Sequence, residues 1–178
     1  MTSSFGGTFT SRLMQEIRVK RGLSYGAHAW MNTERVCSQY VLSANCDTEK
    51  TVETLGVLLD EYDRLYESGL NAEEVEFARR SLRNGFPFTV ETASQEAASR
   101  MRSSLAGRAP GALERYRSFL DSEVNPSEIR DVVKRHLTPR DLAVVIVGTA
   151  EDALTRRLEK LVGVEHVEVV PYDAHLLA

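Results

Sequence analysis

Apolar residues recur every three or four positions over long stretches of the chain, which is the spacing of a helix that buries one face. The clearest stretch is 51–67, whose apolar face consists of Val52, Leu55, Leu58, Leu59, Tyr62, Leu65 and Tyr66. The same spacing, bounded by capping and helix-ending residues, predicts further helices over 11–21, 71–86, 93–106, 110–122, 126–137 and 151–162. The chain is therefore expected to be rich in helix.

Two neighbouring segments, 23–31 and 36–46, have the pattern of a β-hairpin joined by the polar turn 32–35. In 36–46 one side is mainly apolar, and the other side carries Cys37, Gln39, Ser43 and Asn45 together with Val41. This alternation predicts an antiparallel strand with one face on a core and the other toward water or a cleft. The apolar run 141–148 predicts a central strand covered on both faces, and 165–170 predicts a final strand.

Helix boundaries are marked by specific residues. Asn71 followed by Glu74 has the form of a capping box. Phe9 and Met14 have the spacing of a hydrophobic staple around the start of the first helix. Gly22 is suited to the left-handed residue that ends this helix before the hairpin.

The order of these elements predicts an α+β fold, with helices packed on one face of a mostly antiparallel sheet. The length of 178 residues is consistent with a single domain over 1–178. Three to four strands are few for this many helices, which indicates that the sheet is incomplete.

Composition excludes several classes of protein. Hydrophobic residues make up 42% and charged residues 27% of the chain, as in ordinary globular proteins. Acidic residues outnumber basic residues 26 to 22, and the arginine-rich helices also carry glutamates, so no nucleic-acid partner is expected. No apolar run approaches the roughly 20 residues that a membrane-spanning helix requires.

The histidine and cysteine residues are not spaced along the sequence as metal ligands are. The four histidines are His28, His136, His166 and His175, and none forms a His-x-x-x-His or His-x-x-Glu-His motif. Cys37 and Cys46 lie on one predicted strand, roughly 30 Å apart, and face opposite ways. We therefore expect neither a metal site nor a disulfide within this chain.

One segment, 6–26, is distinctive: Gly6-Gly7, a short helix, and then Arg18-Val19-Lys20-Arg21-Gly22-Leu23-Ser24-Tyr25 leading into the hairpin. It resembles the second, non-catalytic domain of the pitrilysin/insulinase family of zinc metallopeptidases, the inverzincins. The predicted helix start at 71–79 and the closing segments 124–137 and 142–148 follow in the same order as in that family. The resemblance covers residues 6 to 170.

The resemblance implies roles for particular residues. The arginine–tyrosine pair of the family falls on Arg18 and Tyr25, which there hold the substrate backbone and stabilise the oxyanion that forms at the peptide carbonyl. A phenol and a guanidinium suit this task, because both interact more strongly as negative charge develops on oxygen. Without the resemblance, Arg18 would be interpreted as a surface cation and Tyr25 as a packed strand aromatic. We also expect Gln39, Ser43 and Asn45 to line the cleft.

The chain departs from the family pattern in two ways. The catalytic motif His-x-x-Glu-His is absent, so the chain alone should not hydrolyse peptides, and zinc is expected in a partner domain or subunit that binds the same peptide substrate. The family domain also begins upstream of Gly6, so we expect a C-terminal piece of a longer processing-peptidase-like polypeptide that lacks its N-terminal strands. The exposed sheet edge could pair with another copy or a partner.

Three functions remain open on the sequence. The first is the non-catalytic half of a two-part zinc metalloendopeptidase. The second is a non-enzymatic scaffold or core-type assembly subunit of the same fold. The third is an independent peptide-binding module that uses its sheet edge. The location is left open between the cytoplasm and the periplasm of a bacterium.

Overall fold

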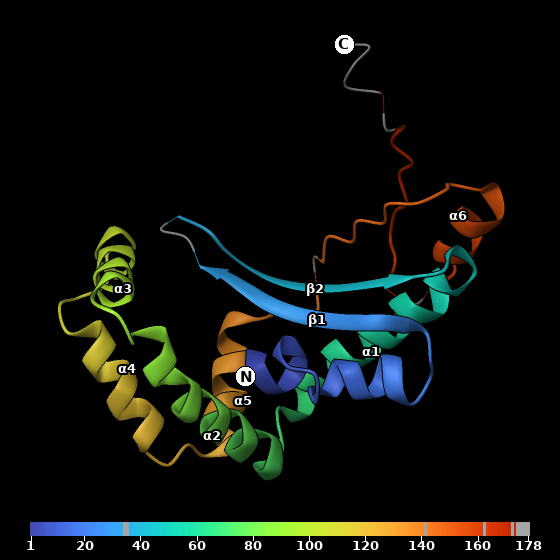
Figure 1. Ribbon diagram of the computed structural model, residues 1–178. Coiled ribbons are helices and arrows are strands. Elements are labelled where there is room, and N and C mark those ends of the chain that lie inside the picture. The colour runs from blue at the N-terminus through green and yellow to red at the C-terminus, as the bar shows by residue number, and fades with distance from the viewer. Residues whose placement is uncertain (34–35, 141, 162, 172, 174–178) are drawn as a thin grey trace.

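The computed structural model describes residues 1–33, 36–140, 142–161, 163–171 and 173 (Figure 1). Two wide helical turns, η1 (Ser3–Gly7) and η2 (Met14–Val19), precede the hairpin β1 (Ser24–Thr33) and β2 (Ser38–Cys46). A short turn, η3 (Thr48–Lys50), leads into the helices α1 (Thr51–Ser68), α2 (Ala72–Thr89), α3 (Ala93–Leu105), α4 (Ala112–Asp121), α5 (Pro126–His136) and α6 (Asp152–Leu158). The predicted α+β class is confirmed.

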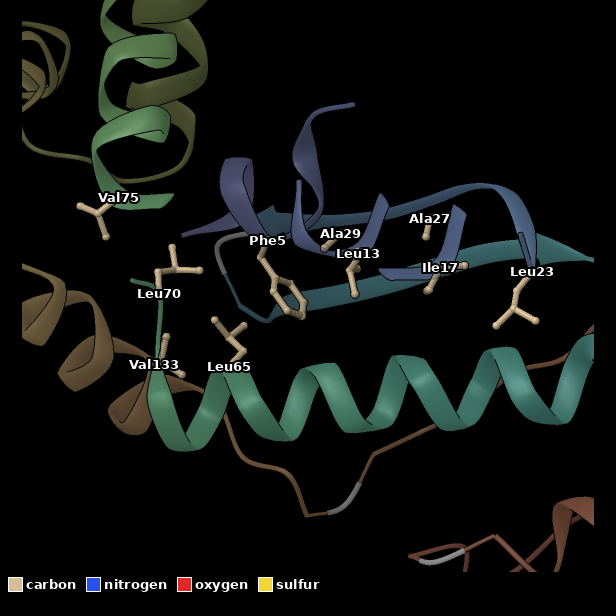
Figure 2. Packing of buried hydrophobic residues seen from close by; sticks show 10 residues of the cluster. All are labelled: Phe5, Leu13, Ile17, Leu23, Ala27, Ala29, Leu65, Leu70, Val75 and Val133. Atoms are coloured by element: carbon tan, nitrogen blue, oxygen red, sulfur yellow. The ribbon is translucent and has the colours of Figure 1, made fainter. Parts of the chain in front are cut away.

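The sheet consists of two antiparallel strands among the described residues. The register pairs His28 with Ser43 and Trp30 with Val41. Ala27 and Ala29 of β1 are buried, and they face the side of the sheet where α1 and the N-terminal segment lie (Figures 1 and 2). The helices thus cover one face of the hairpin, as the alternation of residues predicts.

The main core lies between the hairpin, η1 and η2 on one side and α1 on the other (Figure 2). Figure 2 shows side chains from the N-terminal segment pointing toward Leu65 of α1, while Val133 of α5 reaches the same cluster. Ten buried residues form this cluster: Phe5, Leu13, Ile17, Leu23, Ala27, Ala29, Leu65, Leu70, Val75 and Val133. The N-terminal segment is therefore an integral part of the core.

Gly6 makes the closest backbone approach in this core. A Cβ atom at Gly6 would lie 2.4 Å from the backbone nitrogen of Ala29 and 2.5 Å from its Cβ. Such distances are far inside van der Waals contact, so only glycine allows η1 to lie this close to β1. Gly6 is thus the point where the N-terminal segment packs most closely against the sheet.

An ion pair between Arg12 and Glu74 ties this segment to α2. Arg12 Nε and Nη2 donate to the two carboxylate oxygens of Glu74 at 2.8 Å and 2.6 Å. Glu74 also accepts from the Asn71 N–H, and the predicted capping box is confirmed. Burial alone would raise the pKa of Glu74, but the hydrogen bonds from Arg12 and Asn71 outweigh it and lower the pKa.

The prediction of two C-terminal strands, over 141–148 and 165–170, is wrong. Residues 142–148 and 165–170 have no strand pairing in the structure, and Val145 and Val147 are 85% and 96% exposed. Residue 141 lies outside the described residues. The apolar, β-branched sequence suits a buried strand, but a strand also needs a neighbouring strand for its hydrogen bonds, and none of the described residues provides one. The predicted covering of this run on both faces is therefore also wrong.

Two helix boundaries differ from the expectation in a smaller way. α2 continues past Pro87 to Thr89, because the Pro87 carbonyl still accepts from the Val90 N–H although the residue has no N–H of its own. The first helix, expected over 11–21, opens into the wider turn η2, in which the Lys20 N–H donates to the Gln15 carbonyl five residues earlier.

Replacing Gly6 with alanine should destabilise the fold by about 1–3 kcal/mol, because the added methyl group forces η1 away from β1. Urea unfolding measures the change. Gly85→Ala is a matched control, since no atom lies within 4 Å of its Cβ position inside α2, and it should stabilise by up to about 1 kcal/mol. Equal effects of the two substitutions would contradict the close approach.

Glu74→Gln should destabilise the chain by about 1–3 kcal/mol at neutral pH, because charge-assisted hydrogen bonds from Arg12 are weakened. The folded pKa of Glu74 lies below the usual value of 4.5, so its contribution is fully present above that pH and is lost as the pH falls through the folded pKa. The free energies of unfolding of the wild-type chain and of Glu74→Gln, measured with urea at a series of pH values, should therefore converge as the pH falls below 4.5. Glu73→Gln, at the exposed neighbouring position, should show neither effect.

Candidate functional site

Arg18 and Tyr25 are brought together by the turn between η2 and β1. Gly22 has φ of +60°, a conformation that favours glycine, and it reverses the chain after η2. The Gly22 N–H donates to the Arg18 carbonyl at 3.1 Å, and the Leu23 N–H donates to the Ile17 carbonyl at 3.0 Å. Ile17 and Leu23 are both buried, so the turn is fixed on the core while Arg18 and Tyr25 remain outside it.

A β-bulge places Tyr25 on the outer face of the hairpin. Ser24 pairs with Cys46 and Ala27 with Ala44, so Tyr25 and Gly26 together lie opposite the single residue Asn45. One extra residue in a strand shifts the alternation of its side chains, which leaves both Ser24 and Ala27 buried. Tyr25 is consequently directed away from the core.

The hydroxyl group of Ser24 supports this bulge from inside. Its Oγ lies 2.5 Å from the Asn45 carbonyl oxygen and 2.7 Å from the Gly26 carbonyl oxygen, so its single proton is shared between two acceptors. The same Oγ accepts from the Gly26 N–H at 3.1 Å. Ser24 is only 8% exposed, and its hydroxyl therefore satisfies backbone groups that the irregular ladder leaves without regular partners.

The guanidinium group of Arg18 lies over the Tyr25 ring, with 4.4 Å between Cζ and the ring centroid. It also lies over the ring of Phe9, at 4.8 Å. Tyr25 is 84% exposed and Phe9 is 64% exposed, so neither ring is a core residue. Tyr25 is thus not the packed strand aromatic that residue type alone suggests, and Phe9 does not have the burial expected of a hydrophobic staple.

The neighbouring cations of the same segment have carboxylate partners. Lys20 and Arg21 both pair with Glu16, and Arg12 pairs with Glu74. Burial alone would raise the pKa of Glu16, but its hydrogen bonds with Lys20 and Arg21 outweigh burial and lower that pKa. Among the described residues, no carboxylate or carbonyl oxygen accepts a hydrogen bond from the Arg18 guanidinium.

The outer face of β2 carries the other predicted site residues at different distances from this pair. Asn45 lies opposite Tyr25 at the bulge, and Ser43 pairs with His28 on the same face. Gln39 pairs with Asn32 at the far end of the hairpin, about 20 Å along the strand from Asn45. The structure therefore gathers Asn45 and Ser43 near Tyr25 and leaves Gln39 apart.

Sequence reasoning missed the roles of Phe9 and Ser24 in this site. The spacing of Phe9 to Met14 fits a staple at the start of a helix, and Ser24 is one polar residue in a predicted strand. The sequence signal for Phe9 is an aromatic residue that closely follows the glycine pair Gly6-Gly7 and precedes the cation-rich segment that contains Arg18. A bulge leaves no periodic signal until the strand register is known.

The described residues contain no group of three or more histidine, cysteine, aspartate or glutamate side chains that could hold a metal ion. His175 lies outside the described residues. No helix in the described part of the chain is long and apolar enough to cross a membrane.

Comparison with known proteins shows which family the chain resembles. Residues 1–82 match the family described as the Peptidase M16 inactive domain, and this range contains Arg18 and Tyr25. The crystal structure of a peptidase M16 inactive domain from Pseudomonas fluorescens superposes with a TM-score of 0.70 at 20% identity, over 78% of this chain and 33% of that chain. This likeness shows that the two share a fold.

Curated relatives extend the match along the chain. A protein from Streptomyces coelicolor named as an uncharacterized zinc protease is 25% identical over 91% of this chain and 35% of its own length. A protein from Helicobacter pylori named as a non-peptidase homolog is 28% identical over 80% of this chain and 33% of its own length. The chain thus spans about a third of the relatives that it matches. The resemblance to the inactive domain of the pitrilysin/insulinase, or M16, family of zinc proteases is confirmed.

Replacing Ser24 with alanine should destabilise the chain by about 1–2 kcal/mol, because backbone groups at the bulge lose their hydrogen-bond partner. The amide of Gly26 should also exchange its hydrogen faster, since its N–H acceptor is gone. Ser38→Ala, at the exposed start of β2, should change neither quantity. An unchanged Gly26 exchange rate in Ser24→Ala would show that the hydroxyl does not hold the bulge.

Proposed function

We propose that this chain is the non-catalytic half of a two-part zinc metalloendopeptidase. A partner domain or subunit supplies zinc and the general base, and this chain closes the chamber and binds the peptide substrate. The observation that carries the proposal is the contact between Arg18 and Tyr25, with 4.4 Å between the Arg18 Cζ and the Tyr25 ring centroid. Tyr25 is exposed, and no hydrogen-bond acceptor for the Arg18 guanidinium lies among the residues that the structure describes. Structural cations in the same segment are paired, so Arg18 is available for a ligand.

Both side chains suit a peptide carbonyl. The Tyr25 hydroxyl is a neutral donor, and the Arg18 guanidinium is a planar cation with donors in a fixed fork. Their interaction with the carbonyl oxygen strengthens as that oxygen gains negative charge, so they lower the energy of the transition state more than that of the bound substrate. Because the bulge and the Gly22 turn are anchored to the core, the two groups are held in place before substrate arrives.

The outer face of the hairpin extends the proposed substrate surface. Asn45 and Ser43 follow Tyr25 along this face and offer amide and hydroxyl groups to a peptide backbone. We propose that they line the cleft near the reacting carbonyl, and that Gln39 contacts a more distant part of a peptide in extended conformation. The outer edges of β1 and β2, which have no further strand partner among the described residues, offer backbone groups for a partner or a second copy.

The second candidate function is a non-enzymatic subunit of the same fold that only scaffolds an assembly. The name of the Helicobacter pylori relative, a non-peptidase homolog, favours this candidate. A scaffold has no need for an arginine beside an exposed tyrosine, whereas an oxyanion site needs both. The two functions therefore differ in what the loss of the Tyr25 hydroxyl should do.

In the assembled enzyme, Tyr25→Phe and Arg18→Ala should each lower turnover about 10- to 1,000-fold, because each removes a donor to the developing oxyanion. The measurement is peptide hydrolysis by this chain mixed with a zinc-bearing partner, with and without a chelator. The chain alone should be inactive, and the chelator should abolish activity of the mixture.

Tyr116→Phe is the matched control for the loss of a tyrosine hydroxyl, since Tyr116 lies on α4 away from the hairpin, and it should keep full turnover. Arg108→Ala controls for the loss of a surface arginine. A stable complex that does not hydrolyse a broad peptide pool would favour the scaffold. Full turnover in both Tyr25→Phe and Arg18→Ala would refute the proposed roles.

A further inference from the structure

Phe9 is a large aromatic residue that is not part of the hydrophobic core. It lies in the short connection between η1 and η2 and is 64% exposed, while Phe5, four residues earlier, is completely buried in the core. Single exposed apolar residues are common on protein surfaces, so exposure alone has no functional meaning. What distinguishes Phe9 is its contact with the Arg18 guanidinium, 4.8 Å from its ring centroid to Cζ.

The contact fixes a side chain that is otherwise free to rotate. An arginine side chain has many rotamers, and holding one of them has an entropic cost. Lys20 and Arg21 are held by hydrogen bonds to the Glu16 carboxylate, each through one nitrogen atom. Arg18 is held by aromatic rings, which interact with the face of the guanidinium and leave the donors at its edge available.

Two rings contact the same guanidinium, and they come from different parts of the fold. Tyr25 belongs to β1, and Phe9 belongs to the N-terminal segment that packs against β1 at Gly6. Tyr25 is itself a proposed donor to substrate, so its ring changes its surroundings when a peptide binds. Phe9 carries no hydrogen-bonding group and can hold Arg18 both before and after substrate binding.

We infer that Phe9 is a positioning residue, which holds the Arg18 guanidinium beside Tyr25 with its donors directed outward for a peptide carbonyl. The inference rests on the proposed function of Arg18 and adds to it a residue that does not touch the substrate. An aromatic ring at position 9 is required, because an aliphatic side chain fills similar space but lacks the π-electron face that attracts a cation.

The test uses Phe9→Leu, which removes the ring, and Phe9→Tyr, which keeps it, in this chain assembled with its zinc-bearing partner. Phe9→Leu should lower kcat/KM about two- to tenfold, mainly through kcat, and Phe9→Tyr should restore it. Thermal unfolding should be nearly unchanged in both, because Phe9 is outside the core. Val19→Ala, which shortens an exposed side chain next to Arg18, is the control and should keep full activity.

A double-variant cycle separates positioning from a general structural role. If Phe9 acts through Arg18, Phe9→Leu should cause no further loss in an Arg18→Ala background. A further loss of the same size in that background would overturn the inference. Wild-type kcat/KM in Phe9→Leu, in an enzyme that Arg18→Ala disables, would overturn it as well.

An NMR measurement distinguishes failure of this inference from failure of the proposed function. Ring currents from Phe9 and Tyr25 should shift the Arg18 side-chain Nε–H resonance, and Phe9→Leu should change that shift while Phe9→Tyr preserves it. A resonance that is insensitive to Phe9→Leu would refute the contact whatever the turnover. If the resonance responds but Arg18→Ala retains full turnover, the proposed function fails, and Phe9 holds Arg18 without a role in the reaction.

Discussion

The close contact between Gly6 and Ala29 determines how the N-terminal segment sits on the hairpin. Because no Cβ atom fits between them, η1 lies directly against the β1 backbone, and η2 follows on the same face with Leu13 and Ile17 in the core. The Gly22 turn then returns the chain into β1. Segments that carry Phe9, Arg18 and Tyr25 are thereby fixed with respect to one another, although all three side chains lie outside the core.

Charge is used in two ways along this segment. Arg12, Lys20 and Arg21 pair with the partly buried carboxylates of Glu16 and Glu74, and these pairs connect η2 to its own turn and to α2. Each of these cations donates at least one hydrogen bond to a carboxylate, and these ion pairs stabilise the fold. Arg18 is held by aromatic contacts instead, so its orientation is restricted while its hydrogen-bonding capacity is preserved. This difference separates the proposed binding group from three structural cations of similar sequence context.

Features that depend on local sequence were predictable, and features that depend on distant partners were not. The capping box at Asn71 and the helix 51–67 follow from spacing alone, and the structure reproduces them. The apolar positions Tyr40, Leu42 and Ala44 of β2 pack against the core, although burial does not alternate regularly along this strand. Residues 142–148 have a strand sequence but no strand partner among the described residues, so periodicity could not give their state. A sequence motif predicts Arg18 and Tyr25. The contact of Arg18 with Phe9 could not be predicted in this way, because it depends on how the segment around Gly6 packs against β1.

The geometry at Arg18 also bears on the choice between a scaffold and half of an enzyme. A guanidinium at a permanent protein interface is normally matched by a carboxylate, because an unmatched cation loses hydration when the interface closes. A peptide carbonyl is a weaker acceptor in the ground state and becomes a strong one only as it gains negative charge. An arginine that is oriented by the rings of a phenylalanine and a tyrosine, and whose donors have no acceptor among the described residues, is better suited to this transient charge than to a static contact. The exposed edges of the hairpin, by contrast, fit either function, and the arginine–tyrosine pair is therefore the feature that favours the enzyme.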